Sequence, residues 1–265
     1  MRMKLSMWQV DAFSNRRFAG NPAAIVPLEG WLADELLLAI AAENNLSETA
    51  YIVREGGEYQ IRWFTPTEEV PLCGHATLAS AWLVFHRLEP ERKRVVFRSK
   101  SGELPVERKG ERLVLDFPAN TLEPATATDG AQLVAALGQT PRELYSGWQW
   151  LALYDSEEQL RALRPDMAGI VATGVHGVIV TAPGRDCDFV SRFFAPAAGV
   201  PEDPVTGSAH TRLVPFWAGK LGKTTFFARQ VSSRGGELWC ELSSDKKRVS
   251  IAGEAALFLE GIIDV

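Results

Sequence analysis

Short runs rich in Val, Ile and Phe recur along the whole chain, separated by dipeptides that favour tight turns. β-Branched and aromatic residues favour strands, and a Gly- or Asp-containing dipeptide between two such runs favours a hairpin. Both halves of the sequence therefore predict antiparallel strand pairs, with turn signals at Gly56–Gly57, Lys109–Gly110, Gly235–Gly236 and Ser244–Asp245.

A second apolar pattern, with helical periodicity, lies between the strand runs. Residues 32–43 predict an amphipathic helix, and Ser156 with Gln159 has the spacing of a capping box that starts another. Residues 75–86 are apolar nearly all round, which predicts a helix buried on every side. The segment 208–217 resembles it, but Pro215 is expected to kink or end that helix early, because proline has no N–H for the helical hydrogen bond.

The two apolar helices follow copies of one motif. Residues 62–71 reappear as residues 192–201 at an offset of 130, with Arg, Phe, Pro, Val and Pro matching in place. Just downstream, residues 73–76 correspond to 206–209 at an offset of 133, so the second copy carries three extra residues. Chance similarity between two turns is the weaker explanation, and the repeat predicts a duplicated α+β half.

The duplication also predicts the domain organisation. We expect an N-terminal lobe over residues 1–118 and a C-terminal lobe over 129–265, whose last strand can return to the first lobe. Residues 119–128, rich in Pro, Thr and Ala, are expected to form the crossover between them.

Composition narrows the class of protein. The 265 residues carry a net charge of −5, which argues against nucleic acid as a partner. No apolar run is long enough for a membrane span or a signal peptide. The three cysteines are too few and too scattered for a disulfide framework, so a cytoplasmic location is expected.

The repeated turn suits an anion. A buried helix N-terminus has unpaired N–H groups, and its dipole favours negative charge. Gly74 and Gly207 would let a ligand approach the backbone, and His75 and Ser208 could add side-chain donors. If two such termini converge, the cleft would take a small carboxylate; the alternative is that the glycines are tight-turn residues and Ser208 an N-cap.

Two carboxylates near these turns are candidate acid–base groups. Asp203 lies in the Glu202–Ser208 segment and is expected to belong to the three-residue insertion; its alternative role is a turn-forming Asp before proline. Glu48 lies between a predicted helix and a strand, where a strand entry gives a rigid mount, and its alternative is a solvated loop residue.

Several segments together resemble the PhzF-like family, the phenazine-biosynthesis isomerase and its relatives, which share the diaminopimelate-epimerase fold. They are Asp11–Asn15, Gly20–Ala23, Asn45–Ala50, Cys73–Thr77 and Glu202–Ala209. The resemblance covers both halves, from about Trp8 to Val265. It implies an α+β fold of two pseudo-symmetric lobes, each a curved, mainly antiparallel sheet wrapped around a central helix, with the site between the lobes.

The same resemblance implies roles for individual residues. Glu48 is implied as the general acid/base, with His75, Asp203 and Ser208 lining the site and helping to move protons. Gly74 and Gly207 would give backbone N–H groups to a substrate carboxylate, and Asn21 and Cys73 are further candidates for substrate binding. The implied activity is an isomerase that moves a proton between carbons of a small unsaturated or cyclic carboxylic acid. Neither a metal nor an organic cofactor is required, and a homodimer is expected by analogy.

Other readings have less support. The related epimerases use two thiols, but Cys73 is matched in the second copy by Thr206, a poor base. An epimerase or racemase using Cys73, and a carboxylate-binding protein without catalysis, are the alternatives. Cys73 and His75 are the only close Cys/His pair, so a metal site is not expected. Nucleotide-binding loops and a serine nucleophile elbow are absent from the sequence.

Overall fold

The structure, a computed structural model, describes residues 3–126 and 128–265, so Ala127 of the predicted crossover lies outside the described residues. The chain forms two compact units. Unit 1 contains the residues up to Phe117 together with Ser250–Val265, and unit 2 contains Pro118–Val249.

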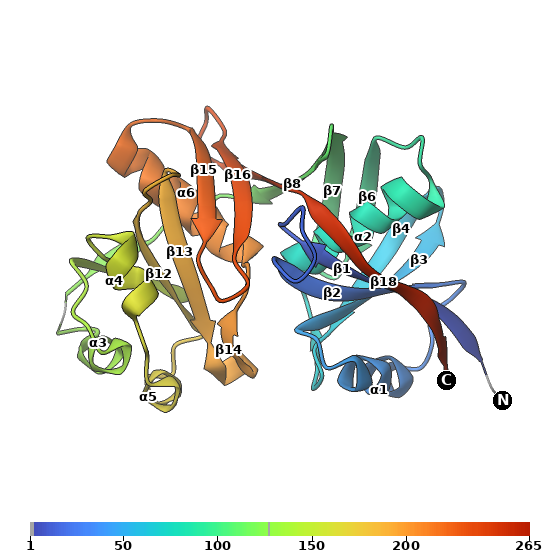
Figure 1. The fold of residues 1–265 in the computed structure, drawn as a ribbon, viewed down its shortest axis with the longest axis horizontal. Coiled ribbons are helices and arrows are strands. Elements are labelled where there is room, and N and C mark those ends of the chain that lie inside the picture. The colour runs from blue at the N-terminus through green and yellow to red at the C-terminus, as the bar shows by residue number, and fades with distance from the viewer. Residues whose placement is uncertain (1–2, 127) are drawn as a thin grey trace. The chain divides into compact units, whose positions relative to one another are not determined.

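Unit 1 is built on a mostly antiparallel sheet (Figure 1). Its strands lie in the order β18 (Ala255–Asp264), β1 (Lys4–Ala12), β2 (Asn21–Leu28), β3 (Glu48–Glu55), β4 (Glu58–Phe64), β6 (Arg94–Ser99), β7 (Gly102–Lys109) and β8 (Arg112–Pro118), and the short β5 (Glu69–Val70) pairs with the end of β4. The pairs β2–β3 and β4–β6 are parallel and the others are antiparallel. The predicted turns at 56–57 and 109–110 connect β3 to β4 and β7 to β8.

Two helices complete the core of unit 1. The helix α1 (Asp34–Asn44) packs Leu37 and Ile40 against β2 and β3, which confirms the amphipathic prediction. The helix α2 (Gly74–Leu83) contacts β1, β2 and β3, and every residue from His75 to Leu83 is buried. The prediction of a helix surrounded by the core is therefore confirmed, and a turn of π-helix (Val84–Leu88) extends it.

Unit 2 repeats this topology. Its strands lie in the order β9 (Glu123–Ala125), β10 (Glu143–Ser146), β11 (Gln149–Leu153), β12 (Gly177–Pro183), β13 (Phe189–Ala195), β15 (Thr225–Gln230) and β16 (Gly236–Leu242), with β14 (Val200–Asp203) on the end of β13. The parallel pairs β11–β12 and β13–β15 take the places of β2–β3 and β4–β6. Duplication of one half explains why both units have the same order of parallel and antiparallel pairs.

The helices of unit 2 are α3 (Ala131–Leu137), α4 (Glu157–Ala162), α5 (Met167–Ala172) and α6 (Gly207–Leu221). Ser156 caps α4 by accepting a hydrogen bond from the Gln159 N–H, as the capping-box spacing predicts. A short 3₁₀ turn, Pro196–Ala198, precedes β14. The helix α6 corresponds to α2, and it packs Trp217 against Phe189 of β13 with nearly parallel rings.

The prediction that Pro215 kinks or ends its helix early is wrong, because α6 continues to Leu221. Pro215 has no N–H to offer the carbonyl of Thr211, four residues earlier. That carbonyl instead accepts the backbone N–H of Asn120 at 3.0 Å, and the Asn120 side chain donates to Thr211 Oγ1 at 2.9 Å. The hydrogen bond that proline removes is thus replaced from outside the helix.

The boundaries of the two units lie between Phe117 and Pro118 and between Val249 and Ser250. Residues 250–265 lie in unit 1, because β18 pairs with β1 from Ala255 to Asp264. Residues after Pro118 lie in unit 2, because β9 pairs with β10. The strand β17 (Arg248–Gly253) contains the second boundary.

The described residues contain no helix that is both long enough and apolar enough to span a membrane.

Candidate active site

Glu48 is the first residue of β3 and pairs in register with Ala23 of β2. The chain reaches it from α1 through Asn45, whose left-handed conformation (φ 49°) ends the helix. Asn44 fixes this connection by donating from its side chain to Thr49 Oγ1 at 3.0 Å. The carboxylate is therefore mounted on a strand entry, as the sequence suggested, and its side chain is 17% exposed.

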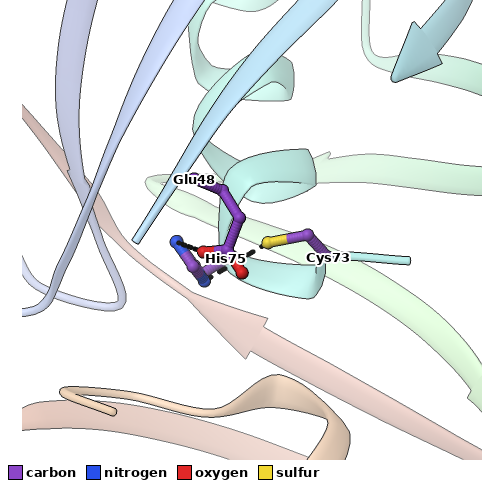
Figure 2. A group of neighbouring side chains, drawn as sticks. All are labelled: Glu48, Cys73 and His75. Carbon is purple, nitrogen blue, oxygen red and sulfur yellow. Dashed lines mark hydrogen bonds and ion pairs between the residues drawn. The ribbon is translucent and has the colours of Figure 1, made fainter. Parts of the chain in front are cut away.

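His75 brings its ring to this carboxylate from the first turn of α2 (Figure 2). His75 Nε2 lies 3.2 Å from Glu48 Oε2, although the geometry is not that of an aligned hydrogen bond. Burial lowers the pKa of His75 to about 3, so the imidazole is neutral near pH 7. The pair is a carboxylate beside a neutral ring rather than a full ion pair.

Asn21 and Cys73 face the opposite ring nitrogen. Asn21 Nδ2 lies 3.1 Å from His75 Nδ1, and Cys73 Sγ lies 3.5 Å from the same atom. With the Asn21 amide oriented in this way its nitrogen donates, so Nδ1 accepts and the ring proton is assigned to Nε2, facing Glu48. Asn21 thereby fixes the tautomer that directs an N–H at the carboxylate.

Donor atoms of Glu48, Cys73 and His75 lie within 4.8 Å of one another, a spacing that could hold a metal ion. A single ion bonds to one nitrogen of an imidazole, whereas Glu48 and Cys73 approach opposite nitrogens of His75. The arrangement therefore does not fit one tetrahedral ion.

The starts of α2 and α6 share an unusual feature. Their N-cap residues, Cys73 and Thr206, both have extended backbone and neither caps its helix with a side-chain hydrogen bond. The N-terminal N–H groups of each helix, including those of Gly74 and Gly207, thus receive no acceptor from the capping residue. Such helix starts are suited to bind an anion.

The hydroxyl of Thr206 contacts Asp203 instead. Thr206 Oγ1 donates to Asp203 Oδ2 at 2.5 Å, and Gln230 Nε2 donates to the Asp203 carbonyl at 2.7 Å and to Thr206 Oγ1 at 3.1 Å. Gln230 Oε1 accepts the Thr206 N–H at 2.8 Å. Gln230 is 1% exposed and fixes the whole Asp203–Thr206 turn.

Sequence reasoning did not single out Gln230. It occupies an inward position of β15, alternating with buried Phe226 and Ala228. A polar side chain at an inward strand position is the signal that could have found it, because a buried amide requires hydrogen-bond partners.

The position of the three-residue insertion needs correction. Asp203 pairs with Phe193 as Val70 pairs with Trp63, so Asp203 replaces Val70 and is not inserted. The extra residues lie earlier, around the 3₁₀ turn after Ala195, where the ladder shifts register.

The structure thus brings the predicted site residues into two groups. Asn21, Glu48, Cys73 and His75 surround one imidazole in unit 1. In unit 2, Asp203 and Ser208 lie on either side of the Gln230-held turn, with Gly207 as the first residue of α6.

Comparison with known proteins gives a consistent result. Residues 10–261 match a family described as phenazine biosynthesis-like protein. An uncharacterised isomerase of Pseudomonas aeruginosa is 55% identical over 262 residues, covering 98% of this chain and 99% of the relative. The crystal structure of a phenazine biosynthesis protein of the PhzF family from Enterococcus faecalis is 44% identical, with a TM-score of 0.94 over 98% of this chain and 99% of that one.

A hydroxyproline epimerase from Agrobacterium vitis also matches, with a TM-score of 0.64, 11% identity, and coverage of 100% of this chain and 94% of that one. At this identity the likeness concerns the fold alone, and it confirms the predicted diaminopimelate-epimerase-like α+β class. The family resemblance drawn from the motifs is confirmed as well, and this chain belongs to the phenazine biosynthesis-like (PhzF-like) family.

Proposed function

We propose that this protein is an isomerase that moves a proton between two carbons of a small unsaturated or cyclic carboxylic acid. Relatives from Pseudomonas aeruginosa and Halalkalibacterium halodurans are named isomerases. In the proposed reaction Glu48 takes a proton from a carbon that is acidified by conjugation and returns it to another carbon of the same molecule. This chemistry needs one carboxylate and no cofactor.

The contact between Glu48 and neutral His75 is the observation that carries the proposal. A neutral ring leaves the carboxylate its basicity, whereas a protonated ring at 3.2 Å would hold the negative charge and weaken the base. The neutral ring lies beside the carboxylate at 3.2 Å without neutralising it.

The intermediate of such a transfer is an enolate-like anion, which requires fixed hydrogen-bond donors. The N–H groups at the starts of α2 and α6 are suited to this role, because neither helix is capped by its N-cap side chain. Each helix start by itself is a candidate for holding a substrate carboxylate, with Ser208 beside that of α6.

Asp203 is proposed as an assisting acid/base in the same reaction. Its support is the turn held by Gln230 and Thr206, which fixes the carboxylate in one orientation. Its replacement of Val70 supports the same role, because a structural repeat has no need of an acid at this position.

Proton NMR in deuterium oxide tests the role of Glu48, using a panel of small unsaturated and cyclic carboxylic acids. The wild type should exchange or isomerise one of them, and Glu48→Gln should lower the rate at least about 100-fold, the usual contribution of a general acid/base. Glu43→Gln, the same change at an exposed residue of α1, should leave the rate unchanged. Exchange by Glu48→Gln at the wild-type rate would show that the assigned base is wrong.

The same experiment separates the alternatives. Cys73 Sγ lies 3.5 Å from His75 Nδ1, which is the observation in favour of thiol chemistry. An epimerase using Cys73 would lose exchange in Cys73→Ser and keep it in Glu48→Gln. A binding protein without catalysis would be stabilised by a carboxylate ligand in every variant and would introduce no deuterium.

A further inference from the structure

Among the residues that the structure describes, Arg212 is a buried cation without an anionic partner. It lies on α6 and is 9% exposed. Its Nη1 donates to Gln149 Oε1 at 3.1 Å, while Nε is buried and has no hydrogen-bond partner among residues 3–126 and 128–265. No Asp or Glu of these described residues pairs with it, and burial alone lowers its pKa.

Two other arginines of this chain show what the Nε–Nη2 edge of a guanidinium binds. Arg62 donates from Nε and Nη2 to the two carboxylate oxygens of Glu69, at 2.9 and 2.8 Å. Arg192 holds Glu202 through the same two nitrogens, at 2.7 and 2.9 Å. In Arg212 it is Nη1 that contacts Gln149, so the Nε–Nη2 edge is the part left to bind a carboxylate.

Among the described residues of unit 2, Arg212 has one hydrogen bond to the neutral Gln149 and the Trp148 ring at 5.9 Å, and no group that neutralises its charge. A buried, unpaired guanidinium lowers stability, because its desolvation is not offset by a partner. At the offset of 133 that relates the two helices, the corresponding residue of α2 is Ala79. The same helix therefore packs in unit 1 without a cation, and a structural requirement does not explain Arg212.

The surroundings of Arg212 are also suited to a small molecule. Trp148 is 61% exposed, its ring stacks on that of His176 at 3.7 Å between centroids, and Arg212 Cζ lies 5.9 Å from the Trp148 centroid. The pair gives an exposed aromatic surface beside a buried cation. Ser208 is four residues before Arg212 on α6, so the two share one face of the helix.

The register of unit 2 places Gln149, the partner of Arg212, beside the position that corresponds to Glu48 in unit 1. Glu48 lies three residues before Tyr51, the partner of Arg62, and Gly177 lies three residues before Val180, the partner of Arg192. A side chain at Gly177 would meet the Phe193 ring at 2.6 Å, so this position carries no acid. Gln149, the partner of Arg212, pairs in register with Gly177.

We propose that Arg212 is a specificity-determining residue that binds the carboxylate group of the substrate through its Nε–Nη2 edge, beside the exposed Trp148 ring. The inference rests on the proposed function, because it takes the ligand to be a carboxylic acid. It assigns recognition of that acid to a side chain of unit 2, in addition to the helix starts.

Binding of benzoate, benzamide and inorganic phosphate at constant ionic strength tests this assignment by thermal shift and calorimetry. Benzoate should stabilise the wild type and benzamide, which has the same size without the charge, should not. Arg212→Gln should raise the benzoate Kd by about tenfold or more, the loss expected for a charge-assisted hydrogen bond. Arg142→Gln, the same change at an exposed residue, should leave the Kd unchanged.

A benzoate response that is absent from the wild type, or unchanged in Arg212→Gln, would overturn the proposal. A larger response to phosphate that depends on Arg212 would overturn the carboxylate assignment.

The ligand-free protein gives a second measurement. Arg212→Met should raise Tm by about 2–4 °C, because it removes an unpaired buried charge while keeping the volume. A structural arginine would instead lower Tm when replaced, which contradicts the proposal.

Glu48→Gln distinguishes this inference from the proposed reaction. It should abolish deuterium exchange and keep the benzoate response. If it keeps exchange, the acid/base assignment fails while the role of Arg212 in binding is still decided by its own variants.

Discussion

The two copies of the repeated turn keep the same framework and differ in almost every group that can do chemistry. In each copy an arginine on the central strand donates two hydrogen bonds to a glutamate. Its guanidinium also lies over a phenylalanine ring, that of Phe64 in unit 1 and Phe194 in unit 2. The pairs are Arg62–Glu69 and Arg192–Glu202, related by offsets of 130 and 133. The offsets place the three extra residues between the members of the second pair.

Outside this framework the copies diverge. Unit 1 has Glu48 and His75 where unit 2 has Gly177 and Ser208. Unit 2 has Asp203 and Arg212 where unit 1 has Val70 and Ala79. Duplication thus preserved what folds each half, while the acid–base pair and the buried cation each belong to one copy only.

The largest expected loss of stability tests which groups neutralise Arg62 and Arg192. Arg192 Nη1 donates only to the carbonyls of Leu160 and Leu163, whereas Arg62 Nη1 pairs with Asp34. Glu202→Gln leaves Arg192 without an anionic partner among the described residues and should lower the free energy of unfolding by about 2–4 kcal/mol.

Glu69→Gln is the matched variant and should cost about 1–2 kcal/mol, since Asp34 still neutralises Arg62. Urea unfolding of both variants measures the two losses of unfolding free energy. Equal losses would show that the two frameworks are energetically the same.

The second prediction concerns acid sensitivity. Burial lowers the pKa of His75 to about 3 and that of His210, on α6, to about 4. In the unfolded chain both histidines have a pKa of about 6.5 and bind a proton below that pH, whereas the buried rings of the folded protein stay neutral. The free energy of unfolding therefore falls as the pH drops from 6.5 towards 4. Each ring contributes a slope of up to about 1.4 kcal/mol per pH unit.

His210→Gln should therefore flatten the dependence of unfolding free energy on pH between 6.5 and 4. The readout is urea unfolding at a series of pH values, with His86→Gln as control because His86 is only partly buried. An unchanged slope in His210→Gln would mean that its ring is protonated in the folded protein.

Much of the candidate site could be predicted because its residues are close in sequence or belong to the repeat. Glu48 at a strand entry and His75 in a buried helix follow from local patterns. Gln230 and Arg212 were missed because their roles depend on tertiary partners. Gln230 lies 24 residues from Thr206, and only the folded chain shows that no acid of the described part pairs with Arg212.

The fold shows the same limit. The strand periodicity and the repeat predict the two halves, since both depend on local pattern. Whether Pro215 ends α6 depends on the N–H of Asn120, which is 91 residues from Thr211 in sequence. No pattern around Pro215 contains that donor.

The smallest expected loss of stability concerns the hydrogen bond from the Asn120 N–H to the Thr211 carbonyl. The helix α2 needs no such bond, because it has Trp82 at the position of Pro215. Asn120→Pro removes the N–H that the Thr211 carbonyl accepts and should lower stability by about 1–2 kcal/mol. Asn120→Ala keeps that N–H and loses only the side-chain bonds, so it should cost less. Thermal unfolding of the two variants compares them, and equal losses would assign the effect to the side chain.

The pairing of β1 with β18 has a consequence for synthesis of the chain. Arg17 Nε donates to the carbonyl of Leu257, 240 residues later, and the ladder from Lys4 to Ala12 depends on the same distant strand. During translation, all of unit 2 is synthesised before β18, the strand that completes the sheet of unit 1. Until the second half of the protein has been made, β1 of unit 1 can pair with β2 but not with β18.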